Sequence, residues 1–132
     1  MDTAGTAAGR FDAGYSCSQA VFSALGERWG IPPELSLKVA AGFGGGMGCS
    51  AQTCGCVTGA IMALGLAQSS VAVEDNRSEK EKTYGVVREF LREFEFHHGA
   101  TLCRDLLECD ISAAEGLARA RQEGLFAARC PA

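Results

Sequence analysis

Residues 42–66, which read GFGGGMGCSAQTCGCVTGAIMALGL, decide the fold of this chain. The stretch opens with five glycines among the seven residues 42–48 and ends in an apolar run. A helix that is apolar almost all round is typical of a helix buried on every side. We therefore predict a glycine-rich loop followed by a central, buried helix over about residues 53–66, with Ser50 or Thr53 as its cap.

Helical patterns also dominate the flanking sequence, whereas strand signals are nearly absent. Short connections between the helices imply mostly antiparallel neighbours. We predict an all-α fold, a single compact bundle of five to six helices that forms one domain over residues 1–132, with residues 1–10 loosely ordered. Besides the central helix, the expected helices cover about residues 12–29, 33–41, 78–98, 101–107 and 112–123.

Two local details of these helices can be tested. The helix over 33–41 is expected to turn Leu35 and Val39 inward. The helix over 112–123 is expected to open with a capping box made by Ser112 and Glu115.

Composition excludes several classes of protein. The chain has 132 residues, of which 47% are hydrophobic and 21% charged, so it is globular rather than disordered. Its net charge of −4 argues against nucleic-acid binding, which requires a basic face. The longest apolar run, residues 56–67, is shorter than the roughly 20 residues that span a bilayer. No basic segment followed by an apolar one resembles a secretory signal. We expect a cytoplasmic protein that is not membrane-embedded.

The glycine loop does not fit a phosphate-binding motif. The letters Gly46, Gly48 and Ala51 match the relaxed dinucleotide pattern, but that pattern needs a strand before it, and the preceding segment is predicted to be helical. No Lys-Ser/Thr pair follows, which excludes a P-loop. The loop instead suits a backbone that approaches a bound centre closely and offers N–H groups to it.

Cysteine is the unusual residue, with seven in 132. In a reducing compartment, clustered cysteines indicate metal or redox chemistry more often than a disulfide framework. No pair has the C-x-x-C spacing of zinc ribbons or thioredoxin-like sites. Cys54 would lie at the N-terminus of the central helix, where the positive field lowers the pKa of a thiol. Cys56 would point about 200° away from it on a helix, so a packing role and a ligand role both stay open.

The histidine pair His97-His98 falls at the end of the helix over 78–98. A solvated helix end is the preferred interpretation, and His98 as a metal ligand is the alternative. No Ser/His/Asp set is evident, and the carboxylates fall mainly on helix faces.

Five sequence blocks in order resemble a known family. They read GYSCSQAV, AAGFGGGMG, TCGCVTGAIMALGL, LCRDLLECDIS and LFAARCP. They are similar to the C_GCAxxG_C_C family of redox-active proteins, over about residues 12–131. The resemblance implies a helical domain with a redox role and places the four signature cysteines at Cys17, Cys54, Cys103 and Cys130. Cys56 stands where the pattern usually has alanine, which favours a packing role for it.

The leading hypothesis from this resemblance is an iron–sulfur or related metal centre that serves electron transfer or redox sensing, rather than a hydrolase or transferase. The partner would be a redox protein or a membrane transporter encoded nearby, and the chain could form a homodimer. A metal-free thiol–disulfide protein, with Cys54 attacking and paired with Cys17 or Cys130, is one alternative, and a structural zinc domain is another. The expected metal ligands are Cys17, Cys54, Cys103 and Cys130, with Cys49 and Cys109 as spare ligands, and the expected N–H donors to the centre are Gly44, Gly45, Gly46 and Gly48.

Overall fold

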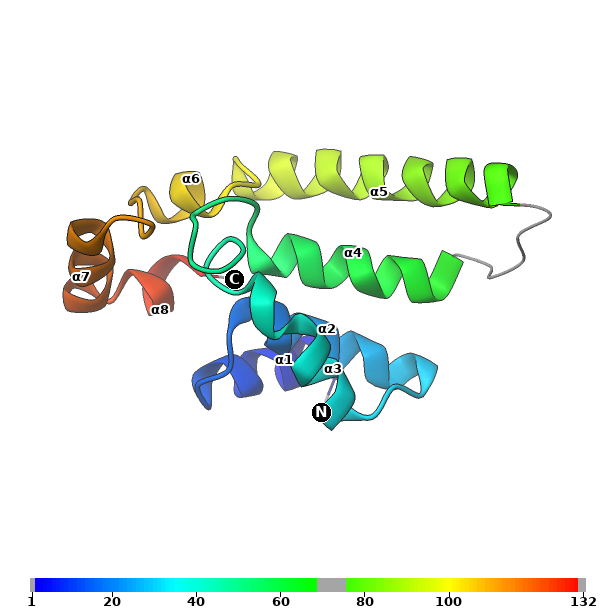
Figure 1. Ribbon diagram of the computed structural model, residues 1–132, viewed down its shortest axis with the longest axis horizontal. Helices are drawn as coiled ribbons and strands as arrows, with labels where there is room; N and C mark the ends of the chain where they lie inside the picture. Colours follow the sequence, from blue (N-terminus) through cyan, green and yellow to red (C-terminus); the bar gives the residue numbers. More distant parts are fainter. Residues whose placement is uncertain (1, 69–75, 131–132) are drawn as a thin grey trace.

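The computed structural model describes residues 2–68 and 76–130 (Figure 1). Within these ranges the chain is all-α, and its only β pairing is one isolated bridge. None of the described helices is long and apolar enough to cross a membrane. The described elements are α1 (Thr3–Asp12), α2 (Cys17–Gly26), the 3-10 helix η1 (Glu27–Trp29), α3 (Pro33–Ala40), the 3-10 helix η2 (Ala41–Phe43), α4 (Gly55–Gln68), α5 (Asn76–His98), α6 (Cys103–Leu107), α7 (Ala114–Glu123) and α8 (Leu125–Arg129).

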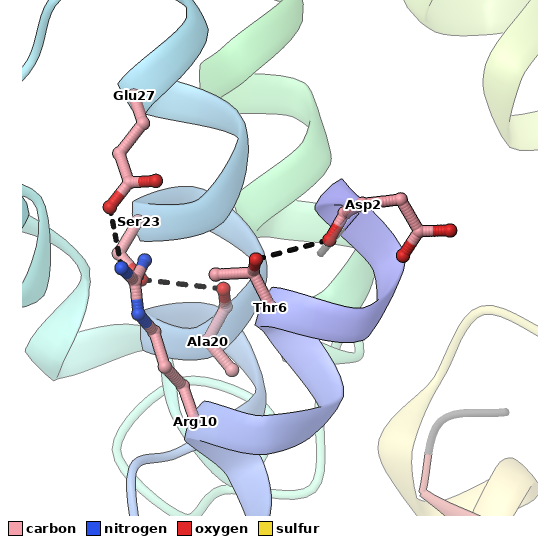
Figure 2. Close-up of polar contacts among 6 residues, drawn as sticks. All are labelled: Asp2, Thr6, Arg10, Ala20, Ser23 and Glu27. Atoms are coloured by element: carbon pink, nitrogen blue, oxygen red, sulfur yellow. Dashed lines mark hydrogen bonds and ion pairs between the residues drawn. The ribbon is translucent and has the colours of Figure 1, made fainter.

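Residues 3–10, for which the sequence suggested a loosely ordered N-terminus, belong to α1. The side chain of Asp2 caps this helix by accepting a hydrogen bond from Gly5 N–H at 2.7 Å. Near its other end, Arg10 donates to Ser23 Oγ at 2.9 Å and pairs with Glu27 (Figure 2). The two contacts of Arg10 hold α1 against α2. The alanines and glycines of residues 3–9 show no apolar pattern at helical spacing, so the sequence did not predict a helix there. Packing against α2 stabilises α1 instead.

The helix expected over 12–29 is in fact divided. Helix α1 ends at Asp12, and residues 13–16, among which Gly14 has a φ of 115°, are not helical. Helix α2 then begins at Cys17. Ser16 and Gln19 form a capping box there, because each side chain bonds to the backbone N–H of the other. This break sets Cys17 at the N-terminus of α2.

Helix α4 is the central helix, as predicted. It packs against α2 on one side and runs beside α5 on the other (Figure 1). Gly59 allows the close approach to α2, since a Cβ on it would lie 3.0 Å from the carbonyl oxygen of Ser18. The helix begins later than expected, at Gly55. The residue directly before it is Cys54, whose carbonyl accepts a hydrogen bond from Val57 N–H at 3.0 Å. The N-cap position therefore belongs to Cys54, and the prediction of Ser50 or Thr53 as the cap is wrong.

Two local predictions are wrong. In α3, Leu35 and Val39 are 51% and 50% exposed, and the helix instead buries Ser36 and Ala40 against α2. The small residues of α3 face inward because α2 approaches too closely for larger ones. Helix α7 has no capping box, because the Ser112 hydroxyl donates to Asp110 and leaves the helix N-terminus without a side-chain cap.

Among the described residues, some of the buried side chains pack into two clusters. One lies between α2, α3 and α4 and is built on Phe22, Ala40 and Ala63. The other joins the loop before α4 to helices α6, α7 and α8, and it includes Cys103, Leu107 and Ile111. The cysteines of the candidate site lie where these two parts of the fold meet.

Candidate functional site

A cavity of about 1000 Å³ opens where the glycine loop meets α2, α4, α5, α6 and α8. Six of the seven cysteines line it, although they come from five separate stretches of sequence. Aromatic side chains from α1, α5 and α8 form much of the remaining wall. The cysteines that line it, called the cavity cysteines below, are Cys17, Cys49, Cys54, Cys56, Cys103 and Cys130.

Cys17 is the centre of a group of three thiols. Its side chain is 9% exposed, and the side chains of Cys54 and Cys56 hydrogen-bond to its sulfur. The backbone N–H groups of Gly45 and Ser18 also donate to that sulfur. The hydrogen bonds from Cys54 and Cys56, followed by those from the backbone, hold the pKa of Cys17 far below its usual value of 9.0, although burial opposes the shift. These hydrogen bonds therefore favour the thiolate form of Cys17.

The prediction that Cys54 carries the lowered pKa is wrong. Its hydrogen bond to Cys17 raises the pKa of Cys54, and the same interaction raises that of Cys56. The sequence prediction assumed that the positive field at the N-terminus of α4 lowers the pKa of Cys54. Cys17 is itself the first residue of α2, so a helix N-terminus acts on this thiol as well. Once Cys17 is ionised, a second negative charge beside it is unfavourable. Cys56 is accordingly more than a substitute for alanine, because its thiol is one of the donors to Cys17.

Gly55 explains how the three thiols come so close. A Cβ on this residue would overlap Cys17 Sγ and would lie 2.8 Å from the backbone nitrogen of Ser18. Only glycine leaves room for the sulfur against the first turn of α4. The Gly55 and Gly59 positions therefore set how closely α2 approaches α4, and with it the contact between Cys17 and Cys54.

A short backbone pairing brings Cys103 to the same cavity. Thr53 and Leu102 form the isolated antiparallel bridge, Cys54 N–H donates to Thr101 at 2.8 Å and Cys103 N–H donates to Gln52 at 2.6 Å. This pairing joins segments about fifty residues apart, and no spacing rule in the sequence could have shown it.

Cys103 and Cys130 differ from Cys17 in their protonation. Burial, reinforced by the negative charges of the neighbouring cysteines, raises the pKa of each of these two thiols to about 12. They interact with Cys17 and Cys54 through charge rather than through hydrogen bonds. Of the six cavity cysteines, Cys17 is thus the one whose pKa is lowered, whereas burial and the neighbouring thiols raise the pKa of Cys103 and of Cys130.

The glycine loop has an unusual backbone. Residues 45–49 all have positive φ, between 59° and 72°, so they form a left-handed turn. Met47 and Cys49 adopt this conformation at a cost of roughly 1–2 kcal/mol each, because their Cβ atoms crowd the following carbonyl. A Cβ on Gly46 would lie 2.8 Å from Cys103 Cβ, so this turn is packed directly against the site.

The loop offers fewer free N–H groups than expected. The amides of residues 47–52 donate to carbonyls within residues 42–47 of the same loop, and Gly48, for example, donates to Gly42 at 2.8 Å. Gly45 is the loop residue whose N–H reaches a cysteine sulfur. Gly44 and Gly45 line the cavity, whereas Gly46 and Gly48 are not among its lining residues. The loop is preceded by α3 and η2 rather than by a strand, which agrees with the rejection of a dinucleotide motif.

The remaining candidates separate into two groups. Cys49 lines the cavity, is exposed and donates to the Ile111 carbonyl at 3.6 Å. Cys109 is not among the lining residues, and it is buried in the core, where its thiol donates to the Gly116 carbonyl at 3.2 Å. His98 also lines the cavity and stacks on Phe94 with ring centroids 4.5 Å apart. His98 is the last residue of α5 and is exposed, as the preferred interpretation of a solvated helix end expected.

A family model described as Putative redox-active protein (C_GCAxxG_C_C) matches residues 15–132. The chain belongs to this family. The match confirms the resemblance seen in the sequence. No curated protein and no solved structure matches the chain.

The geometry can be compared with what a metal would require. Among residues 2–68 and 76–130, no three histidine, cysteine, aspartate or glutamate side chains converge as a ready site for one metal ion. A structural zinc site needs four ligands about 2.0–2.3 Å from a single ion. An iron–sulfur cluster spreads its thiolate ligands over several irons, so its ligands lie farther apart. Cys17, Cys54 and Cys56 lie in contact with one another, and Cys103 and Cys130 lie beyond them.

Proposed function

We propose that this chain is a redox protein that holds an iron–sulfur cluster in the cavity through Cys17, Cys54, Cys103 and Cys130. The observation that carries the proposal is the convergence of six thiols from five stretches of sequence on one cavity. Such a cluster would supply one-electron chemistry. A redox role agrees with the description of the family.

The environment of the four cysteines supports this assignment. Soft thiolate ligands select iron–sulfur clusters, zinc or Cu(I), and zinc has no redox chemistry. The Gly45 and Ser18 amides already hydrogen-bond to the Cys17 sulfur, and such bonds raise the potential of a cluster. Cys103 and Cys130 must each release a proton on binding, because their pKa values are about 12. Assembly should therefore become more favourable as pH rises.

The test is anaerobic purification followed by iron and sulfide analysis and visible spectroscopy. Two alanine variants give a matched comparison, because Cys103 and Cys109 are both 7% exposed and lie in the same buried cluster. Cys103→Ala should abolish the cluster, whereas Cys109→Ala should keep it because Cys109 does not line the cavity. A colourless, iron-free wild-type protein after anaerobic reconstitution would refute the proposal.

A second candidate, a metal-free thiol–disulfide protein, is favoured by the contact between Cys17 and Cys54. In that reaction the Cys17 thiolate attacks a substrate disulfide, releases one substrate thiol and forms a mixed disulfide. Cys54 loses its proton and attacks Cys17 Sγ, which releases the second thiol and leaves a Cys17–Cys54 disulfide. Mass spectrometry of the iron-free protein after mild oxidation should then find this disulfide. Recovery of both cysteines as free thiols under conditions that oxidise a control dithiol would exclude it.

A further inference from the structure

The cavity is larger than the proposed centre requires. An eight-atom cluster takes on the order of 240 Å³ if each atom occupies roughly the 30 Å³ of a water molecule in the liquid. The cavity measures about 1000 Å³, so most of its volume lies beyond the cysteines. The remaining space falls within the range of pockets that bind small organic ligands, roughly 300–1000 Å³.

The outer part of the cavity has aromatic walls. Phe90 and Phe94 face it from α5, Phe126 from α8 and Phe11 from α1. All four are only partly buried by the rest of the chain. Partly exposed aromatic faces around one cavity favour a flat ligand, because offset stacking adds about 0.5–1.5 kcal/mol to the burial of area.

The polar groups around these walls are mainly hydrogen-bond donors. Tyr15, His98 and Arg121 line the cavity, and among the described residues Asp12 is the one carboxylate that does so. Among the described residues, neither the Arg121 guanidinium nor the Tyr15 hydroxyl has a hydrogen-bond or ion-pair partner. Donors without partners at the edge of an aromatic pocket suit a ligand that carries carbonyl oxygens, which only accept.

We propose that the outer cavity binds a planar, conjugated dicarbonyl compound of the quinone class. The walls select its flat ring, and Arg121 and Tyr15 meet its oxygens. The choice of a redox-active ring rests on the proposed function, since such a ligand would lie beside the cavity cysteines. There a quinone would take two electrons and two protons from two thiols, which would be oxidised to a disulfide as the quinol forms. The pocket itself does not depend on a bound cluster.

Duroquinone, tetramethyl-1,4-benzoquinone, is a suitable probe. Its ring positions are all substituted, so it does not add to thiols as simpler quinones do, and at about twelve heavy atoms it needs on the order of 360 Å³. Binding is measured by anaerobic equilibrium dialysis against the full chain. Quinone and quinol are quantified together by chromatography, so that reduction by the thiols does not distort the result. Saturable binding to the wild-type protein is expected.

Two matched pairs of variants test the location. Phe94→Leu keeps an apolar side chain but removes the flat face, and it should weaken binding about tenfold. Phe96→Leu, two residues away on α5, is the control because Phe96 is 85% exposed and lies outside the cavity. Arg121→Gln should weaken binding several-fold, whereas Arg119→Gln on the same helix should not, because Arg119 pairs with Glu123 and does not line the cavity.

The outcomes separate this inference from the proposed function. Absence of saturable binding, or equal losses in Phe94→Leu and Phe96→Leu, overturns the quinone site whether or not iron is present. Protein that stays iron-free after anaerobic reconstitution and still binds duroquinone with the predicted pattern supports the pocket and refutes the cluster. Circular dichroism of each variant must match the wild type, and a variant that fails is replaced by Phe126→Leu, which tests the same wall.

Discussion

Gly55→Ala should destabilise the protein and disturb its thiol centre together. Within a helix, alanine is favoured over glycine by about 1 kcal/mol. At this position the new Cβ would overlap Cys17 Sγ and lie 2.8 Å from the backbone nitrogen of Ser18. A backbone atom cannot turn away as a side chain can, so α2 and α4 must separate. Overpacking of this kind costs typically 1–3 kcal/mol. Subtracting the helix gain of about 1 kcal/mol from this cost leaves an expected net loss of up to about 2 kcal/mol.

Gly65→Ala is the matched control on the same helix. A Cβ there would meet nothing within 4 Å, so the helix preference alone should act and the protein should gain up to about 1 kcal/mol. Urea denaturation followed by circular dichroism measures both changes as shifts of the midpoint at constant slope. Gly55→Ala should also slow the loss of free thiols at Cys17 and Cys54 under mild oxidation. Equal stability of the two variants would refute the close-packing argument.

Three further predictions use the same denaturation assay. Ser16→Ala should cost about 1 kcal/mol because it removes the cap of α2, whereas Ser112→Ala should change stability by less than about 0.5 kcal/mol; similar losses in the two would contradict the assigned caps. Met47→Gly should stabilise the metal-free protein by up to about 1 kcal/mol, since its φ of 67° suits glycine, and a loss would show that the side chain matters more than the strain. Stability of the metal-free protein should fall as pH rises from 9 towards 12, because the raised pKa values of Cys103 and Cys130 keep both protonated in the folded chain while the unfolded chain releases those protons. Cys130→Ala should make that fall shallower than in the wild type, and an unchanged slope would contradict the burial of this thiol.

Some of the architecture followed from local sequence. The central helix α4 was predicted because its residues are apolar all round, and such a segment has no other place in a folded chain. The long helix α5 was predicted because its apolar residues recur at helical spacing over more than twenty residues. The membership of the family was also evident, because it rests on five blocks whose order does not depend on folding.

Other features could not be predicted because they depend on distant partners. The segment over 3–12 forms a helix because α2 provides Ser23 and Glu27 for Arg10. The prediction of which face of α3 points inward was wrong, because α2 lies so close that Ser36 and Ala40 fit against it but Leu35 does not. In each case the deciding contact joins residues that pattern analysis treats separately.

The sequence by itself determined that the chain is helical, rich in thiols and a member of this family, because composition, periodicity and family motifs are local properties. It could not determine which thiol is ionised. Only the tertiary structure decided this, because the thiolate of Cys17 depends on hydrogen bonds from Cys54, Cys56 and Gly45, all at least 28 residues away. Gly55 makes the contact between Cys17 and Cys54 possible, because the absence of a Cβ on this residue leaves the space that Cys17 Sγ occupies.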